Sequence, residues 1–139
     1  MKQATHVFRL DTRGPGLVEF TDEIADWLSG QGFATGLMTL FCRHTSASLT
    51  IQENASPEVR SDLEAAFARL APEAPGLYAH ADEGPDDMPA HIRAVLTGVS
   101  LSIPVIGGRM ALGTWQGVYL FEHRRRPHRR EVVAHVMGE

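Results

Sequence analysis

Hydrophobic and polar residues alternate in several short stretches of the chain, a pattern typical of β-strands with one buried face. The predicted strands span residues 5–10, 17–20, 35–43, 47–53, 100–105, 109–123 and 130–137. The apolar stretch 35–43 is expected to be an inner strand, with 47–53 as its antiparallel neighbour. The glycine pair at 107–108 predicts a hairpin turn, and the stretch 109–123 is expected to be one long strand or two strands broken near Gly113 or Gly117.

Three other stretches carry apolar residues at the spacing of a helix. We expect these helices to begin at Thr21, at Ser56–Pro57 and near Met88–Pro89, since Ser and Thr cap helices and proline suits the first turn. The side chains expected to face the core are Ile24, Trp27, Leu28, Val59, Leu63, Phe67, Leu70, Ile92, Val95 and Leu96. Strands occur in adjacent runs with helices between the runs. This order predicts a single α+β domain over residues 1–139, with an antiparallel sheet core and two to three helices.

The composition of the chain argues against two classes of partner, membranes and nucleic acids. The chain has 139 residues, of which 43% are hydrophobic, enough for a core of its own. No apolar run approaches the ~20 residues of a membrane helix, and the first residues lack the apolar segment of a signal peptide. We therefore expect a cytoplasmic protein without a membrane partner. The formal net charge of −4 argues against a nucleic-acid partner. The one cysteine, Cys42, lies in an apolar run and is expected to be a buried, inert thiol.

A basic tract, HRRRPHRR at residues 123–130, contrasts with the acidic balance of the whole chain. We expect it to form a solvent-exposed hairpin tip. The alternative is an anion site in which one inner arginine binds phosphate, because the guanidinium group matches phosphate oxygens well.

The segment HTSAS at 44–48 joins two predicted strands and supplies an imidazole and three hydroxyl groups. Hydroxyl and backbone N–H groups at a tight turn suit a phosphate group, so Thr45 and Ser46 are candidate substrate-binding residues. A turn with a structural histidine is the alternative. Ser46 could also be the nucleophile of a serine hydrolase, although the chain has no G-x-S-x-G motif.

The segment HADEGPDDMPAH at 80–91 combines two histidines with four carboxylates before a predicted helix. Negative charge at a helix start is favourable, which accounts for the acids, and for Asp87 in particular. It does not account for His80 and His91. Together with His44 they form a set of three imidazoles, a common arrangement for a transition metal with an open coordination position. The segment therefore predicts either a site for a divalent metal, Zn²⁺ or Mg²⁺, or an acidic helix start without a metal.

Two further segments carry polar groups beside predicted strands. Glu53 and Asn54 precede the second helix, and Asp62 lies on that helix. In LGTWQGVYLFEH at 112–123, strict alternation places Thr114, Gln116 and Glu122 on one face of the strand, and Trp115 could stack on a ring.

Taken together, the segments HTSASLTIQENASPEVRSDLE, YAHADEGPDDMPAHI and LSIPVIGGRMALGTWQGVYLFEHR, with the closing REVV, resemble the YjbQ-like family, also called the secondary thiamine-phosphate synthase family. The resemblance spans nearly the whole chain in the same order. Two features depart from the family pattern. Gln52 stands where an asparagine is expected, and the RRRPHRR tract is unusually basic.

The resemblance implies a compact α+β domain that assembles as a homotrimer, with a polar site around the three histidines. The function it suggests is a weak thiamine-phosphate synthase activity, in which a pyrimidine diphosphate joins a thiazole phosphate. The expected catalytic residues are Glu53, Asp62, Asp86 and Glu122. The expected residues for a small phosphorylated substrate are Thr45, Ser46, Asn54, Thr114, Trp115, Gln116 and Arg124, and the expected metal ligands are His44, His80 and His91. The alternative function is a non-catalytic trimer that binds a metal or a phosphorylated ligand.

Overall fold

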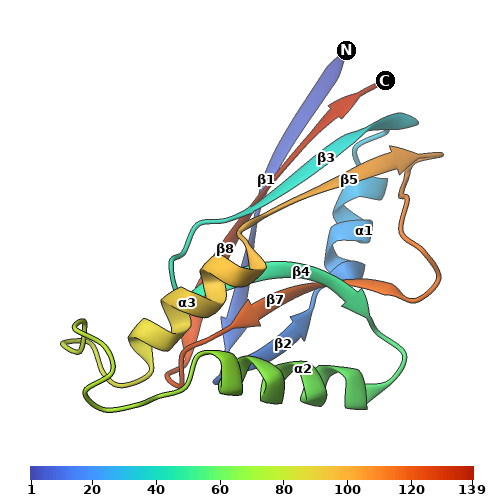
Figure 1. Ribbon diagram of the computed structural model, residues 1–139. Helices are drawn as coiled ribbons and strands as arrows, with labels where there is room; N and C mark the ends of the chain where they lie inside the picture. Colours follow the sequence, from blue (N-terminus) through green and yellow to red (C-terminus); the bar gives the residue numbers. More distant parts are fainter.

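Two antiparallel sheets form the framework of the computed structural model, which describes all 139 residues (Figure 1). The five-stranded sheet has the order β1 (Lys2–Thr12), β8 (His128–Gly138), β3 (Thr35–Cys42), β5 (Ser100–Ile106) and β6 (Arg109–Met110). The three-stranded sheet has the order β2 (Gly16–Glu19), β7 (Gln116–Glu122) and β4 (Ala47–Glu53). The predicted α+β fold class and each predicted strand are confirmed, with the 109–123 stretch divided into β6 and β7.

The main hydrophobic core lies between the two sheets. Its 18 buried residues come from both sheets, from helix α1 (Thr21–Ser29) and from Phe20 and Phe33 on either side of that helix. Alternation decides which side chains enter it: on β3, Met38, Leu40 and Cys42 are buried. The predicted burial of Ile24 and Leu28 on α1 is confirmed. Burial also raises the pKa of the Cys42 thiol, in agreement with an inert cysteine.

The strand pairing expected between residues 35–43 and 47–53 is wrong. β3 pairs with β5 and β8, whereas β4 pairs with β7 in the other sheet. The connecting segment 43–46 crosses from one sheet to the other. Alternation within each strand says which face is buried, but it does not say which strand is the hydrogen-bonded neighbour.

Helix α2 (Pro57–Leu70) covers the outer face of the three-stranded sheet (Figure 1). Leu63 and Phe67 pack on this face, with the Phe67 and Phe121 ring centroids 5.4 Å apart. Leu70, which was expected in the core, is exposed. The helix begins at the predicted proline, but Ser56 makes no capping bond to the backbone and donates to Glu58 instead.

Helix α3 (Asp87–Thr97) packs against β4 with a different face from the predicted one. The residues that it buries are Asp87, Pro89, Ala90 and Ala94. Val95 and Leu96 were expected to face the core, yet they are exposed. Small residues allow the helix to lie close to the strand, which leaves its larger side chains outward. None of the three helices has both the length and the apolar content to cross a bilayer.

The hydroxyl of Thr21 does not cap α1. It donates to Glu19 Oε2 at 2.8 Å and accepts the backbone N–H of Val118 at 2.8 Å. The same Glu19 oxygen explains a glycine in the LGTWQG segment: a Cβ atom at Gly117 would lie 2.4 Å from it. The predicted hairpin turn is confirmed at Gly107 and Gly108, which have φ values of 59° and 77° and join β5 to β6.

A buried ion pair joins the two sheets at one end. Arg130 on β8 donates from Nε to Glu122 Oε1 on β7 at 2.8 Å, and its Nη2 contacts Glu122 Oε2 and Ser46 Oγ. Both side chains are almost fully buried. Thr12 Oγ1 on β1 donates to Glu122 Oε1 at 2.6 Å. Residues 123–127 therefore connect β7 of one sheet to β8 of the other. The prediction that the basic tract is an exposed hairpin tip is wrong for Arg130, which is buried.

Removing Arg130 would leave the Glu122 carboxylate buried without its partner. We expect Arg130→Met to lower the free energy of unfolding by about 3–5 kcal/mol, because an unpaired buried charge is costly. The matched control is Arg129→Met, since the Arg129–Asp11 pair is largely exposed and worth little. Urea unfolding of both variants measures the difference. Equal stability of the two variants would show that the buried pair does not hold the sheets together.

Candidate functional site

Two histidines and a carboxylate converge at the start of α3. His80 Nε2 lies 2.7 Å from Asp87 Oδ2, and His91 Nε2 lies 3.0 Å from the same oxygen. The three ligand atoms lie within 4.8 Å of one another. Asp87 and His91 share a helix face because they are four residues apart. His80 comes from the preceding loop, whose return to the helix start brings the third group into place.

The hydrogen bonds of His91 define how its ring can act. Its Nδ1 lies 2.8 Å from the carbonyl oxygen of Thr45. A carbonyl only accepts hydrogen bonds, so Nδ1 carries a proton. The Nε2 atom then faces a carboxylate oxygen and needs either a second proton or a cation between the two atoms. This arrangement, with Nδ1–H on a backbone carbonyl and Nε2 turned inward, is the usual one for a metal-binding histidine.

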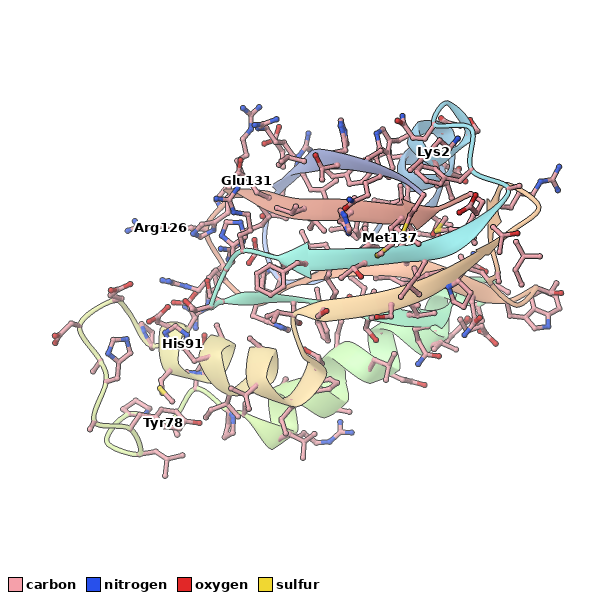
Figure 2. The ribbon with its side chains drawn as sticks, turned by 90° about the horizontal axis from the view of Figure 1, so that it is seen from above. Lys2, Tyr78, His91, Arg126, Glu131 and Met137 are labelled. Atoms are coloured by element: carbon pink, nitrogen blue, oxygen red, sulfur yellow. The ribbon has the colours of Figure 1, made fainter.

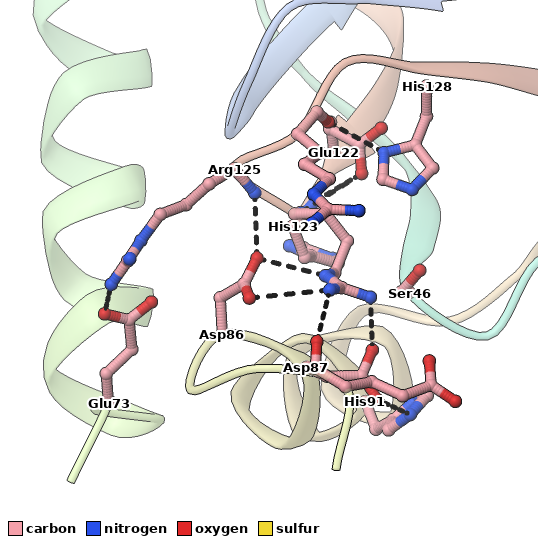
Figure 3. A network of polar contacts seen from close by, with 12 residues as sticks. Ser46, Glu73, Asp86, Asp87, His91, Glu122, His123, Arg125 and His128 are labelled. Atoms are coloured by element: carbon pink, nitrogen blue, oxygen red, sulfur yellow. Dashed lines mark hydrogen bonds and ion pairs between the residues drawn. The ribbon is translucent and has the colours of Figure 1, made fainter. Parts of the chain in front are cut away.

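Arg124 holds the Asp87 carboxylate of this cluster and the neighbouring Asp86 in place. Figure 3 shows these two aspartates, with Asp86 facing the backbone of Arg125. Arg124 Nη1 donates to Asp87 Oδ1 at 2.6 Å and its Nε donates to Asp86 Oδ2 at 3.0 Å. Asp86 also accepts the backbone N–H of Arg125 at 2.9 Å. Burial opposes ionisation of Asp87, but the contacts with His80, His91 and Arg124 outweigh it and lower its pKa. The carboxylate is thus fixed in its charged form.

The structure exchanges the roles expected for the two neighbouring aspartates. Asp87, expected to serve only the helix start, is the residue between the histidines. Asp86, expected to be catalytic, binds the guanidinium of Arg124 and the backbone of the basic tract. Arg124 in turn uses Nε, Nη1 and Nη2 within the chain, the last on the carbonyl of Glu83 at 2.9 Å. The i, i+4 spacing of Asp87 and His91 was the signal that could have found the correct aspartate.

His44 does not join the cluster, so the geometry does not support it as a third metal ligand. Its Nε2 accepts the backbone N–H of Glu131 at 2.7 Å. Burial, followed by the nearby Arg130 charge, lowers its pKa, which keeps the ring neutral. Because Nε2 accepts, the proton lies on Nδ1. His44 is therefore a neutral hydrogen-bond donor beside the cluster.

The two serine hydroxyl groups of HTSAS are buried and do not face a substrate. Ser46 Oγ accepts from Arg130 Nη2 at 3.0 Å and has no histidine partner. Ser48 has one, His123 Nε2 at 2.8 Å, but both residues are buried. Burial lowers the pKa of His123 to about 3, with the Arg93 charge acting in the same direction. Neither serine is an accessible, base-activated nucleophile, which argues against the serine hydrolase alternative.

Most of the remaining predicted site residues lie at the opposite end of β4 and β7, but Glu122 does not. Ala47 pairs with Glu122 at one end of this strand pair, and Glu53 pairs with Gln116 at the other. Seven residues of strand separate the two ends, about 20 Å. Thr114, Trp115 and Gln116 are exposed there, and Asn54 donates to Glu19 Oε2 at 3.1 Å. Asp62 is exposed on α2. Within one chain these residues do not join the histidine cluster, and Glu122 is committed to Arg130.

Two hollows flank the cluster. One, of about 780 Å³, is lined by Phe41–Thr45 and by the α3 side that includes His91 and Val95. The other, of about 750 Å³, has no hydrophobic lining residue and lies between the 82–86 loop and the basic residues Arg124–Arg126 and His128. Figure 2 shows His91 and Arg126 at the same end of the molecule, away from Lys2 and Met137. The cluster thus has an apolar hollow on one side and a polar hollow on the other.

Comparisons with known proteins agree with this fold. A family model described as "UPF0047 protein YjbQ-like" matches residues 6–139. UPF0047 protein sll1880 of Synechocystis is 53% identical over 99% of this chain and 94% of its own length. UPF0047 protein YjbQ of Salmonella typhimurium is 47% identical over 94% of each chain. A YjbQ/UPF0047 family crystal structure from Clostridium acetobutylicum superposes with a TM-score of 0.87 at 32% identity, covering 95% of this chain and 99% of that one.

The buried neutral His123 predicts a loss of stability in mild acid. Its folded pKa of about 3 lies below the ordinary value of 6.5, so the unfolded chain binds a proton that the native protein excludes. Stability is then lost as pH falls through and below the unfolded value, by about 2 kcal/mol between pH 7.5 and pH 5. Urea unfolding against pH measures this slope. It should flatten in His123→Gln but not in the control His6→Gln, whose side chain is exposed. If the dependence of stability on pH stayed the same in His123→Gln, the loss of stability in acid could not be due to His123.

Proposed function

This chain belongs to the UPF0047 YjbQ-like family, and we propose that it is a metal-dependent enzyme whose divalent ion is bound by His80, Asp87 and His91. The observation that carries the proposal is the meeting of two imidazole Nε2 atoms on one carboxylate oxygen, at 2.7 and 3.0 Å. Tetrahedral ligands on Zn²⁺ lie about 3.4 Å from one another, given metal–ligand distances near 2.1 Å. The two contacts would lengthen by about 0.4–0.7 Å to admit the ion.

The surroundings of the three residues support the same proposal. Thr45 O fixes the His91 ring, and Arg124 Nη1 fixes the second oxygen of Asp87. Such outer contacts orient metal ligands in most protein sites. Two nitrogen ligands and one oxygen favour Zn²⁺ or a similar transition ion over Mg²⁺, which prefers oxygen alone. Three protein ligands leave a fourth position for a substrate atom or a water molecule.

A small phosphorylated molecule is the proposed substrate. When bound, the ion would neutralise charge on a phosphate or leaving-group oxygen. The polar hollow beside the cluster offers Arg125, Arg126 and His128 to phosphate groups, although the carboxylates of Asp82, Glu83 and Asp86 line its other side. The specific reaction suggested by the family resemblance joins a pyrimidine diphosphate to a thiazole phosphate and releases pyrophosphate. In that reaction, Arg124 would keep Asp87 oriented rather than contact the substrate, because its side chain is committed to the 83–87 segment.

One observation favours the second candidate, a non-catalytic protein that binds a metal or a phosphorylated ligand. Of the four carboxylates expected to be catalytic, Glu53 and Asp62 lie away from the cluster, Glu122 is paired with Arg130 and Asp86 with Arg124. None of these four carboxylates therefore stands free beside the histidines within one chain. A binding protein needs none.

We also propose that the protein assembles as a homotrimer, as the family resemblance suggests. The outer face of the five-stranded sheet supports an interface between copies, since α1 and the three-stranded sheet cover only its inner face. This outer face carries the exposed apolar side chains Leu37, Phe41, Ile106 and Met137. Leu37 and Met137 are direct neighbours across β3 and β8. Exposed apolar residues grouped in this way commonly mark an interface.

Metal content and turnover, measured on the same purified variants, test the proposed function. We expect about one Zn²⁺ per chain in the wild type. His80→Ala, His91→Ala and Asp87→Asn should each weaken binding at least tenfold, because each removes or weakens one of three ligands. His44→Ala should retain the ion, since His44 is a hydrogen-bond donor outside the cluster. Turnover of a pyrimidine diphosphate with a thiazole phosphate should follow metal content.

The outcomes separate the two candidates. Full metal binding in His80→Ala and His91→Ala would refute the site. Metal binding that follows the variants, with no turnover of these substrates or of a panel of phosphate esters, would favour the non-catalytic protein.

The assembly proposal predicts a change of mass on substitution of the sheet face. Leu37→Glu should shift the molecular mass in light scattering from three chains toward one, because three charges would meet in an apolar interface. Ala68→Glu, on the exposed side of α2, is the control and should leave the mass unchanged. A wild-type monomer, or a trimer that persists in Leu37→Glu, would contradict this interface.

A further inference from the structure

An exposed tryptophan stands on the short connection between β6 and β7. Trp115 is 63% exposed, although the backbone around it is held in place. Its carbonyl oxygen accepts the N–H of Asn54 at 2.9 Å, and the next residue, Gln116, bonds to Gly113 through both its backbone and its side chain. Tryptophan is among the residue types that carry most binding energy at protein interfaces, and a fixed loop loses little freedom on binding. The fold thus presents a large aromatic side chain that has no partner within the chain.

The apolar hollow beside His91 is the complementary feature. Its volume is about 780 Å³, which exceeds that of an indole ring, and Phe41, Val95 and Val99 contribute to its apolar lining. Val95 is 83% exposed and Phe41 48% exposed, so the chain itself leaves this surface uncovered. Phe41 also belongs to the outer sheet face proposed above as the interface between copies. The hollow therefore continues that interface around the end of β3.

Trp115 cannot reach this hollow within its own chain. The hollow lies near the Ala47–Glu122 end of the β4–β7 pair, and Trp115 precedes β7 at the other end, about 20 Å away. A contact between the two must join different copies. Because it uses one surface of the first copy and another surface of the second, it is a heterologous contact, the kind that closes a ring of three chains.

The charges around the two features favour the same pairing. Glu19 and Glu53 lie at the tryptophan end, together with one guanidinium, that of Arg60 over the Tyr119 ring. The polar residues that line the hollow include no carboxylate: they are Arg43, His44, Thr45 and His91. Arg43 is about half exposed and only loosely paired, 3.9 Å from Glu131. An acidic surface therefore faces a basic one when the tryptophan enters the hollow.

We infer that Trp115 of one copy inserts into the apolar hollow beside His91 of the next copy, so that each site in the assembly is built from two chains. The inference deepens the proposed assembly and rests on it in one respect, that the chain forms a trimer. It requires no metal ion. The contact brings Asn54 and Gln116 of the neighbouring copy to the side of the histidine cluster. The two groups of predicted site residues, which the paired strands of one chain hold apart, then meet across the interface.

Two single substitutions and their mixture test this contact by light scattering. Trp115→Ala removes the inserted side chain and keeps the hollow, whereas Val95→Glu keeps the tryptophan and places a charge in the hollow. Each variant alone should associate at least tenfold more weakly and shift the mass from three chains toward one. An equal mixture should form a species of two chains, because the tryptophan of Val95→Glu still fits the hollow of Trp115→Ala. A two-fold symmetric contact would give no such recovery.

The matched control is Leu96→Glu, which is also exposed on α3 but lies outside the hollow and should stay trimeric. Fluorescence provides a second measurement on the same proteins. Acrylamide should quench the tryptophan emission of Val95→Glu more strongly than that of the wild type or Leu96→Glu, because only Val95→Glu releases Trp115 to solvent. Trp27, which stacks on His6, contributes equally to all three proteins.

The inference fails if either Trp115→Ala or Val95→Glu stays fully trimeric, or if their mixture remains two monomers. If both stay trimeric while Leu37→Glu dissociates, the sheet-face interface stands and this contact falls. If both dissociate and recover in the mixture while Leu37→Glu stays trimeric, this contact stands and the sheet-face interface falls. A wild-type monomer would overturn both.

Discussion

The buried ion pair between Glu122 and Arg130 is the contact on which the arrangement of the site depends. It ties β7 of one sheet to β8 of the other, with Thr12 and Ser46 bound to the same pair. Glu122 Oε2 also accepts the backbone N–H groups of His123 and Arg124, at 3.0 and 3.1 Å. This fixes the direction in which the chain leaves β7. The Arg124 side chain then reaches Asp86 and Asp87, so the order of the histidine cluster derives from a charge buried between the sheets.

The polar side chains considered for the site lie at the two opposite ends of the β4–β7 pair. One end holds the imidazole cluster, the arginines and both hollows. The other holds Asn54, Trp115 and Gln116 on a loop and a strand start, near the carboxylates of Glu19 and Glu53. A single chain cannot bring these groups together, because the strands between them are rigid and paired along their full length. Any function that needs both ends requires more than one copy or a long ligand.

Strand and helix positions were predictable because alternation and helical spacing report directly on burial. The pairing of β4 with β7 could not be predicted, because each sheet buries one face and the alternation of apolar and polar residues looks the same in a strand of either sheet. On α3 the spacing gave an apolar stripe, but Ala90 and Ala94 made the closer contact with β4, so Val95 was left outside. In the site, His80 and His91 were found from their segment alone. Asp87 and the Glu122–Arg130 pair depend on side-chain directions that spacing restricts but does not determine.

The place of β8 in the five-stranded sheet sets the order in which the protein can fold during synthesis. β8 pairs along eleven residues with β1 and also with β3, so two of the earlier strands share one late partner. Until β8 leaves the ribosome, β1 and β3 each have an unpaired edge, and Glu122 has no arginine. Contacts so distant in sequence are slow to form. The nascent chain would therefore expose aggregation-prone strand edges until β8 emerges, and the histidine cluster would be organised only after that step.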